Sequence, residues 1–350
     1  MAILAAGRKL TPGAILRPLA GLLVGSVLAL LLGEGILRRV GLGHPHFSSP
    51  ELYRASEDPR VLFEMQPDFD GSSEGTLVRT NARGLRERDL PTVPAPDTTR
   101  VLFLGDSVTF GSGVHAEEAF PRLLETELAS AAGRVETLNA GVVGYNTLQE
   151  LGRLEGVGLA YRPDVVVLTF VVNDMLDSFS IFDHQYRPSP PFAGAKVWLR
   201  KHSHLYRFVQ GTYWRVAQDL RRTTDPAPEP LRKRDRLEQR LVQLRQIVET
   251  AHANGARFLL VLYPDNLSDP VSPGPNGKRL TMRDELRRFA ESEDVPLLDL
   301  TDALGDVRDP RARQFRLGED PHPSPAGHRA IADAARGPLL DLLAERLGRR

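Results

Sequence analysis

From residue 100 to residue 347, the chain alternates short apolar runs with longer stretches in which apolar residues recur every three or four positions. The short runs are bounded by turn-forming residues and predict five strands, at 101–104, 134–141, 163–174, 256–264 and 295–300. The periodic stretches predict five helices, at 117–129, 148–159, 237–253, 282–291 and 325–347. Strands that alternate with helices form a parallel sheet covered on both faces. We therefore expect a three-layer α/β/α domain over residues 100–347.

A different apolar run lies near the N-terminus, from Pro18 to Gly33, and it contains no charged residue. With a rise of about 1.5 Å per residue, a helix extended to Leu37 is roughly 30 Å long, which is enough to cross a bilayer. A buried core helix or a cleaved signal peptide has a similar pattern, but the flank GEGILRR lacks a small-x-small cleavage site. We expect residues 1–40 to form a cytoplasmic stub and an uncleaved transmembrane anchor. The basic N-terminus then places the rest of the chain outside the cytoplasm.

Two further segments do not belong to the alternating pattern. Residues 41–99 are rich in turn-forming residues and end in PTVPAPDTTR, which predicts an irregular extracytoplasmic connector. Residues 193–222 carry both tryptophans and other aromatic residues at helical spacing, which predicts a helical insertion in the α/β domain of residues 100–347. This aromatic stripe is explained either by packing against the core or by a lid that binds substrate.

Composition and charge narrow the possible partners. The 350-residue chain has 45 basic and 45 acidic residues, so no overall positive field would attract nucleic acid. The absence of cysteine excludes disulfides, thiol nucleophiles and cysteine metal sites. Histidines and carboxylates lack zinc-like spacing, and no nucleotide-binding glycine motif follows a strand, so we expect neither a metal nor a cofactor. The oligomeric state stays open.

Polar residues and glycines collect at the ends of three successive predicted strands. The first strand ends at Gly105-Asp106-Ser107, the second in NAGVVGYNT, and the third at Asn173-Asp174. In open parallel sheets, ligands bind beyond the carboxyl ends of the strands, where the strand order reverses. We therefore expect the Ser107 side chain to point into such a crevice.

A serine hydroxyl becomes an effective nucleophile when a base removes its proton, and histidine is the usual base at neutral pH. His322 lies in GEDPHPSPAGH, which follows the fifth strand and can reach the same crevice. The histidine needs a carboxylate to orient it, and Asp320 and Glu319 are both close in sequence. Residues two apart in an extended loop point the same way, which favours Asp320.

Acyl transfer also needs donors for the oxyanion that forms in the transition state. The backbone N–H of Ser107 is one candidate donor. Gly144 allows close backbone approach and is a natural second donor. The side-chain amide of Asn173 is the third candidate.

Four segments resemble the sequence blocks of the SGNH (GDSL-like) hydrolase superfamily in the expected order, namely GDSVTFG, NAGVVGYNT, VVND and DPHPS. The resemblance implies a flavodoxin-like sheet of five parallel strands, with Ser107 as nucleophile, His322 as base, and Gly144 and Asn173 in the oxyanion hole. Val171 departs from the third block, which usually has glycine at this position. The segment TNARGLRERDL is similar to one that precedes the domain in membrane-anchored members.

These residues predict a serine esterase that hydrolyses a small acyl or acetyl ester, on a carbohydrate or a lipid, through an acyl-enzyme. An alternative is an O-acyltransferase that passes the acyl group to an envelope polysaccharide. A non-catalytic binding module on the same fold is a further alternative, but the joint presence of serine, histidine, acid and amide argues against it.

Overall fold

The structure is a computed structural model of the 350-residue chain. It describes residues 12–40, 50–73, 75–175, 229–274, 279–318 and 320–347, together with residues 195, 198–199, 202–206, 208–209 and 212–213. The chain forms two compact units: the first joins Met1–His46 with Ser189–Thr224, and the second joins Phe47–Pro188 with Asp225–Arg350.

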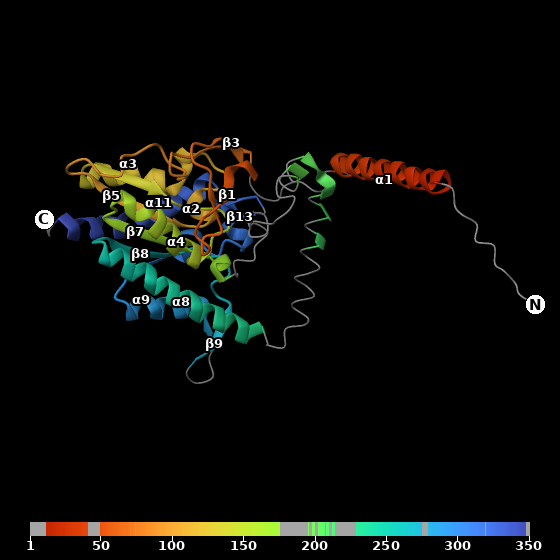
Figure 1. The fold of residues 1–350 in the computed structure, drawn as a ribbon. Helices are drawn as coiled ribbons and strands as arrows, with labels where there is room; N and C mark the ends of the chain where they lie inside the picture. The colour runs from red at the N-terminus through yellow and green to blue at the C-terminus, as the bar shows by residue number, and fades with distance from the viewer. Residues whose placement is uncertain are drawn as a thin grey trace, which may run out of the picture. The chain divides into compact units, whose positions relative to one another are not determined.

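The second unit is built on a five-stranded parallel sheet in the order β11-β8-β7-β5-β6 (Figure 1). The strands are β5 (Thr99–Gly105), β6 (Val135–Asn139), β7 (Val165–Phe170), β8 (Arg257–Leu262) and β11 (Leu297–Asp299). Numbered along the chain, this order is 2-1-3-4-5, the flavodoxin-like arrangement. The predicted fold class is therefore confirmed, and the strand order reverses between β5 and β7.

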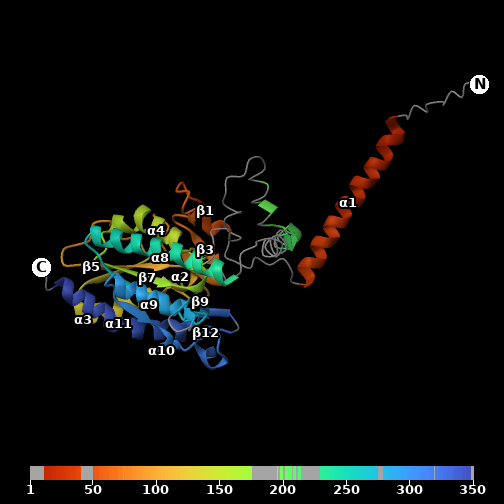
Figure 2. The same ribbon diagram turned by 90° about the horizontal axis from the view of Figure 1, so that it is seen from below.

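Helices cover both faces of this sheet, as Figure 2 shows. On one face are α4 (Thr147–Gly156), α8 (Glu229–Ala253) and α9 (Met282–Ser292), and on the other are α3 (Phe120–Ala132) and α11 (Pro325–Leu347). The β-strands alternate their side chains between two apolar clusters: Leu102 and Leu104 face the first group, and Val101 and Phe103 the second. Helix α8 begins at Glu229, before the predicted start at residue 237. The apolar period could not predict this first part, because its residues are mostly polar.

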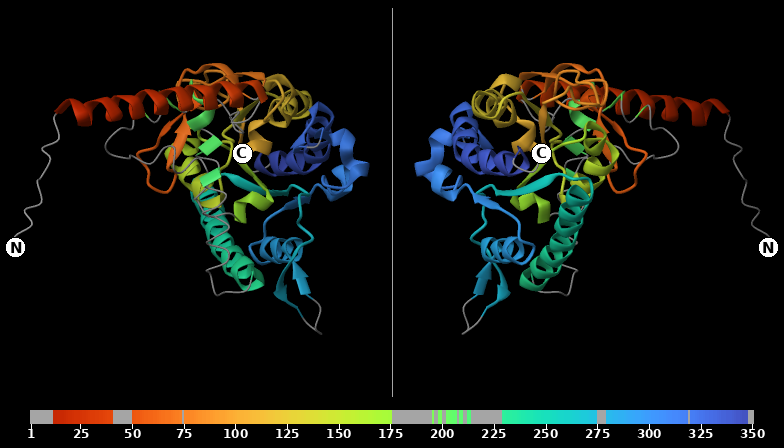
Figure 3. Two further views of the ribbon diagram at one scale, coloured as in Figure 1. Left: turned by 90° about the vertical axis from the view of Figure 1, so that its right-hand side faces the viewer. Right: turned by 90° about the vertical axis from the view of Figure 1, so that its left-hand side faces the viewer.

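Shorter elements complete the second unit. They are η1 (Pro50–Leu52), β1 (Tyr53–Ala55), β2 (Phe63–Met65), β3 (Asp70–Ser73), β4 (Thr76–Arg79), α2 (Ser107–Phe110), η2 (Ala116–Glu118), η3 (Gly158–Tyr161), η4 (Val172–Met175), β9 (Pro270–Pro273), β10 (Arg279–Thr281), α10 (Thr301–Leu304), η6 (Pro310–Phe315), β12 (Arg316–Leu317) and β13 (Asp320–Pro323). The β9 and β10 strands pair antiparallel and project away from the sheet, cyan in Figure 3.

Residues 50–99, which the sequence analysis treats as irregular, contain two antiparallel pairs, β1 with β2 and β3 with β4. Their apolar side chains form a third cluster in which the Phe63 ring contacts Tyr53 and Tyr145 edge to face, with centroids 5.7 and 5.3 Å away. The Tyr145 hydroxyl also donates to the Phe63 carbonyl. These strands have three or four residues, too short to show a period of two in the sequence.

The first unit contains α1 (Pro12–Val40). Within it, Arg17–Val40 is long and apolar enough to cross a membrane, with a mean hydropathy of 2.1. The structure describes only part of the predicted insertion at 193–222, and most of the described residues there are helical. Their large side chains Trp198 and Tyr213 are exposed, so these two do not pack into a core.

The third apolar cluster predicts that residues 50–99 stabilise the second unit. Phe63 is completely buried, and Phe63→Ala should lower the free energy of unfolding of the full chain by about 3–5 kcal/mol because it leaves a cavity. Leu77→Ala, at an exposed position in β4, is the control and should change it by no more than about 0.5 kcal/mol. Chemical denaturation in detergent measures both values, and equal effects of the two variants would contradict this packing.

Candidate active site

Ser107 begins the short helix α2, directly after the carboxyl end of β5. The Asp106 side chain caps this helix, since its Oδ1 accepts a hydrogen bond of 2.9 Å from the Val108 N–H. The Ser107 side chain is buried, and its hydroxyl lies 3.3 Å from Asp106 Oδ2. The turn thus places the serine at the carboxyl ends of the strands, next to the point where the strand order reverses.

His322 reaches this serine from β13, which is 215 positions later in the chain. Its Nε2 lies 2.7 Å from the Ser107 Oγ, and its Nδ1 lies 2.5 Å from Asp320 Oδ1. The same carboxylate oxygen accepts a bond of 3.0 Å from the His322 backbone N–H. The hydrogen bond with the imidazole lowers the pKa of Asp320 below its ordinary value. Glu319, the alternative acid, lies outside the described residues.

The segment that carries His322 is held on both sides. The hydroxyl of the buried Tyr263, just after β8, donates a 2.6 Å hydrogen bond to the Pro321 carbonyl. On the other side, the Ser324 backbone N–H donates to the Phe315 carbonyl, and its hydroxyl donates to the Gln314 carbonyl. The sequence analysis did not assign a role to Tyr263. The only feature of the sequence that could have indicated one is its hydroxyl group at the end of the fourth predicted strand.

Asn173 lies in η4, directly after β7, and its amide Nδ2 donates a 2.6 Å hydrogen bond to Asp106 Oδ2. An amide nitrogen carries two hydrogens, so one N–H of Asn173 is left for another acceptor. Gly144 has a φ of +80°, which favours glycine over other residues. Within the described part of the chain, neither the Ser107 nor the Gly144 backbone N–H donates to another group.

The loop that carries Gly144 packs directly on α2. The Val142 N–H donates to the Gly105 carbonyl, and a Cβ added to Gly141 would lie 2.5 Å from the Phe110 nitrogen. No side chain larger than hydrogen fits at residue 141 without moving the backbone. This close approach brings the end of β6 to the start of the helix that carries Ser107.

A buried arginine supports the other end of α2. The Arg86 guanidinium donates to the carbonyl oxygens of Phe110, Gly111 and Val114 at 2.6–2.8 Å, and lies over the Phe110 ring. The preceding turn is itself fixed, because the Asn81 side chain accepts from two backbone N–H groups of residues 83–85. The TNARGLRERDL segment therefore holds the backbone that follows the serine, a role the sequence analysis did not assign to Arg86.

Two further acids, Glu150 of α4 and Asp174 of η4, are buried near Asp106. Burial raises the pKa of Glu150 well above its ordinary value, and the charges on Asp174 and Asp106 raise it further, while Arg240 opposes the rise. Burial and the Asp106 charge likewise raise the pKa of Asp174, although its Oδ2 accepts a bond from the Val171 N–H. The Val171 side chain, in place of the usual glycine, packs into the apolar cluster that faces α3 and α11.

His328, in α11, is buried and plays a different part from His322. Its Nδ1 accepts a hydrogen bond from the Phe120 N–H, and its ring stacks on that of Phe120. Burial, together with the positive charges of Arg86 and His322, lowers the pKa of His328 to about 3. The ring is therefore neutral at physiological pH and serves the packing of α11 on α3.

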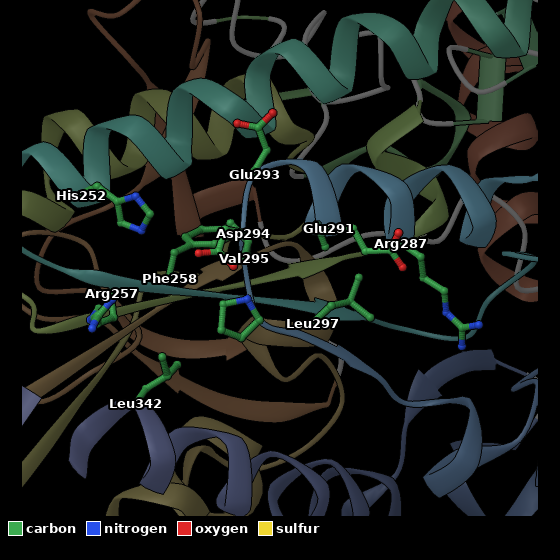
Figure 4. A pocket seen from close by; sticks show the side chains of 12 residues that line it. His252, Arg257, Phe258, Arg287, Glu291, Glu293, Asp294, Val295, Leu297 and Leu342 are labelled. Carbon is green, nitrogen blue, oxygen red and sulfur yellow. The ribbon is translucent and has the colours of Figure 1, made fainter. Parts of the chain in front are cut away.

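A cavity of about 820 Å³ lies away from these residues, and Figure 4 shows the side chains that line it. It is lined by the amino-terminal ends of β8 and β11, including Arg257 and Leu297, and by His252 of α8. Two charged side chains at its rim are engaged in ion pairs, Glu293 with Arg245 and Arg287 with Asp299. Since Ser107 follows the carboxyl end of a parallel strand, this cavity is remote from the serine and belongs to another part of the surface.

The buried acids predict a pH dependence of stability. The unfolded chain loses the Glu150 proton near its ordinary pKa of 4.5, whereas the folded chain keeps it to higher pH, so stability falls as the pH rises above this value. Glu150→Gln removes this loss, so the stability of the variant should fall less than that of the parent protein as the pH rises above 4.5. Glu249→Gln, at an exposed position of α8, is the control. Unfolding curves across this pH range that shift equally for both variants would contradict the assignment.

Comparison with known proteins shows the family to which this chain is similar. A model of the GDSL-like lipase/acylhydrolase family matches residues 103–330. Among solved structures, the chain is similar to TesA, with 17% sequence identity and a TM-score of 0.43 over 70% of this chain and 99% of that chain. It is also similar to the psychrotrophic esterase EstA from Pseudoalteromonas sp., with 16% identity and a TM-score of 0.40 over 71% of this chain and 99% of that one.

A third similar structure is the acetyl xylan esterase AlAXEase, with 16% identity and a TM-score of 0.39 over 68% of this chain and 98% of that one. No curated protein matches the chain. The family match alone covers more than half of the sequence. The chain therefore belongs to the GDSL-like lipase/acylhydrolase family.

Proposed function

We propose that this chain is a serine esterase that cleaves a small acyl or acetyl ester through an acyl-enzyme intermediate, with Ser107 as nucleophile and residues 100–347 as catalytic domain. The observation that supports this best is the 2.7 Å contact between the Ser107 Oγ and the His322 Nε2, continued by the 2.5 Å contact with Asp320. A neutral imidazole held by a carboxylate at Nδ1 presents an unprotonated Nε2 to the hydroxyl.

In the first half of the reaction, the Ser107 Oγ attacks the ester carbonyl carbon while His322 Nε2 takes the hydroxyl proton. The tetrahedral intermediate collapses, the bond to the alcohol oxygen breaks, and His322 returns the proton to the leaving alkoxide. A water molecule then repeats the sequence: His322 takes its proton, the hydroxide attacks the acyl carbon, and the bond to Ser107 breaks. The carboxylic acid leaves, and the proton returns to the serine.

The oxyanion of each tetrahedral intermediate is assigned to three N–H groups, those of the Ser107 and Gly144 backbone and the second N–H of the Asn173 amide. Asp106 supports this role because it accepts the first Asn173 N–H and so fixes the plane of the amide. Removal of one such donor typically costs about 10²–10³-fold in kcat. Such a donor set can lower the barrier only when it is fixed before the charge develops, which the buried contacts of Asp106 favour.

The N-terminal helix supports a location at the membrane. We assign α1 as a single uncleaved anchor, with the catalytic domain on the extracytoplasmic side, because Arg17–Val40 is long and apolar enough to span a bilayer. An ester carried by an envelope carbohydrate or by a lipid would then be within reach of the serine.

The nucleophile is tested by Ser107→Ala, which removes the attacking oxygen but leaves the fold and the cap of α2. Hydrolysis of p-nitrophenyl acetate by the purified full chain should fall at least about 10³-fold, and a serine-directed phosphonate should no longer label the protein. If the variant and the parent protein are equally active, the proposed function is wrong. Acyl transfer to an added glycan without release of acid would assign a transferase instead.

The orienting acid is tested by a matched pair of variants, Asp320→Asn and Glu319→Gln. Asp320→Asn removes the charge that holds the His322 Nδ1 hydrogen, so kcat for p-nitrophenyl acetate should fall about 100-fold or more. Glu319→Gln should leave kcat within about threefold of the parent value. The reverse ranking of the two variants would transfer the role to Glu319.

A further inference from the structure

An acidic residue interrupts the apolar helix α1 near its C-terminal end. Glu34 directly follows the uncharged run that ends at Gly33. A carboxylate at the edge of a membrane-spanning helix is costly unless other groups satisfy it. Within the helix, the Arg38 Nε donates a hydrogen bond of 2.7 Å to Glu34 Oε1, one turn further on.

The other partners of this carboxylate come from the predicted insertion. The Ser203 hydroxyl and the backbone N–H groups of His204 and Leu205 donate to Glu34 at 2.8–2.9 Å. Arg38 adds a hydrogen bond of 2.6 Å to the His202 carbonyl. Both parts belong to the first unit, and Figures 1 and 2 show them side by side at the C-terminal end of α1. The insertion thus binds to α1 through Glu34, the one acidic side chain of that helix.

The same segment exposes three large apolar side chains, Trp198, Val209 and Tyr213, whose exposed fractions are 60%, 56% and 63%. Trp and Tyr are enriched where a bilayer meets water, because their rings are apolar while their N–H and O–H groups bond to headgroups. In water, by contrast, these side chains would form an unfavourable apolar surface.

The position along α1 fixes the depth of this contact. The uncharged run from Pro18 to Gly33 spans roughly 24 Å at about 1.5 Å per residue, which is most of the roughly 30 Å of the hydrocarbon core. With α1 inserted as the proposed anchor, Glu34 would lie near the boundary between hydrocarbon and headgroups, and Arg38 and Arg39 would lie in the headgroup layer. Any segment bound to Glu34 lies at the level of the interface.

From these contacts we infer that the described residues between 195 and 213, the interfacial segment, form a second membrane contact. The partner is the headgroup region of a lipid bilayer, in which Trp198, Val209 and Tyr213 are immersed while Glu34 holds the segment to α1. This inference rests on the proposed membrane anchoring by α1. Along the chain, the interfacial segment follows Asn173, so the catalytic unit would connect to the membrane through this insertion as well as through α1.

The absence of cysteine allows a direct test with single labels. Val209→Cys carries an environment-sensitive fluorophore in the interfacial segment, and Val242→Cys carries it in α8 of the catalytic unit, where the valine is 51% exposed. The full chain is reconstituted into phosphatidylcholine liposomes with brominated acyl chains. We expect the lipid bromines to quench the label at 209 at least about threefold more than the label at 242. Equal quenching of both by aqueous iodide, and of neither by the lipid, would overturn the inference.

Glu34 provides the second arm. Glu34→Ala removes the acceptor of the Ser203, His204 and Leu205 hydrogen bonds, and should reduce lipid quenching at 209 about twofold or more. Unchanged quenching would mean that Glu34 does not dock the segment. Flotation with the liposomes reports the anchoring separately: a chain that floats but keeps 209 in water contradicts this inference alone, whereas a chain that does not float contradicts the anchor. Hydrolysis of p-nitrophenyl acetate should be unchanged in the proteins that carry Glu34→Ala, Val209→Cys or Val242→Cys.

Discussion

The buried carboxylate of Asp106 is the contact on which the arrangement of the strand ends depends. It caps the helix that begins at Ser107 and also accepts a hydrogen bond from the Asn173 amide. One side chain thus joins the ends of β5 and β7, the neighbouring strands between which the strand order reverses. Burial of a carboxylate is unfavourable and raises the pKa of Asp106, and these hydrogen bonds offset part of the cost. The position of the serine relative to the amide is therefore set by a single desolvated group.

Two other contacts hold the backbone on either side of that group. Arg86 donates to three carbonyl oxygens after α2, and Tyr263 donates to the carbonyl that precedes His322. Both are bonds from a side chain to the backbone, and they join positions 24–28 and 58 residues apart. The guanidinium suits its place because it offers several fixed N–H donors to converging carbonyls. The backbone that follows Ser107 and the backbone that precedes His322 are thus each held by a side chain from a distant part of the sequence.

Apolar periodicity and sheet topology make a large part of this structure predictable from the sequence. The five strands, the helix Pro325–Leu347 and the meeting of Ser107 with His322 all derive from apolar patterns and from the rule that parallel strands end at one edge. Arg86 and Tyr263 could not be predicted as supports, because no spacing rule links a side chain to a distant carbonyl. The short strands of residues 50–99 could not be predicted for a related reason. Their position depends on packing in the cluster around Phe63, not on a local sequence pattern.

Three buried carboxyl groups, those of Asp106, Glu150 and Asp174, lie near the oxyanion site that we propose. A negative charge on Glu150 or Asp174 would oppose the oxyanion charge that we assign to the Asn173 amide, since both acids are buried near Asp106. Burial raises the pKa of both groups, so the acid form is favoured and the charge is withheld. The positive charge of Arg240 favours ionisation and opposes this effect. Burial thus acts on these two acids in the opposite direction to the hydrogen bonds that lower the pKa of Asp106, and it reduces the negative charge close to the Asn173 amide.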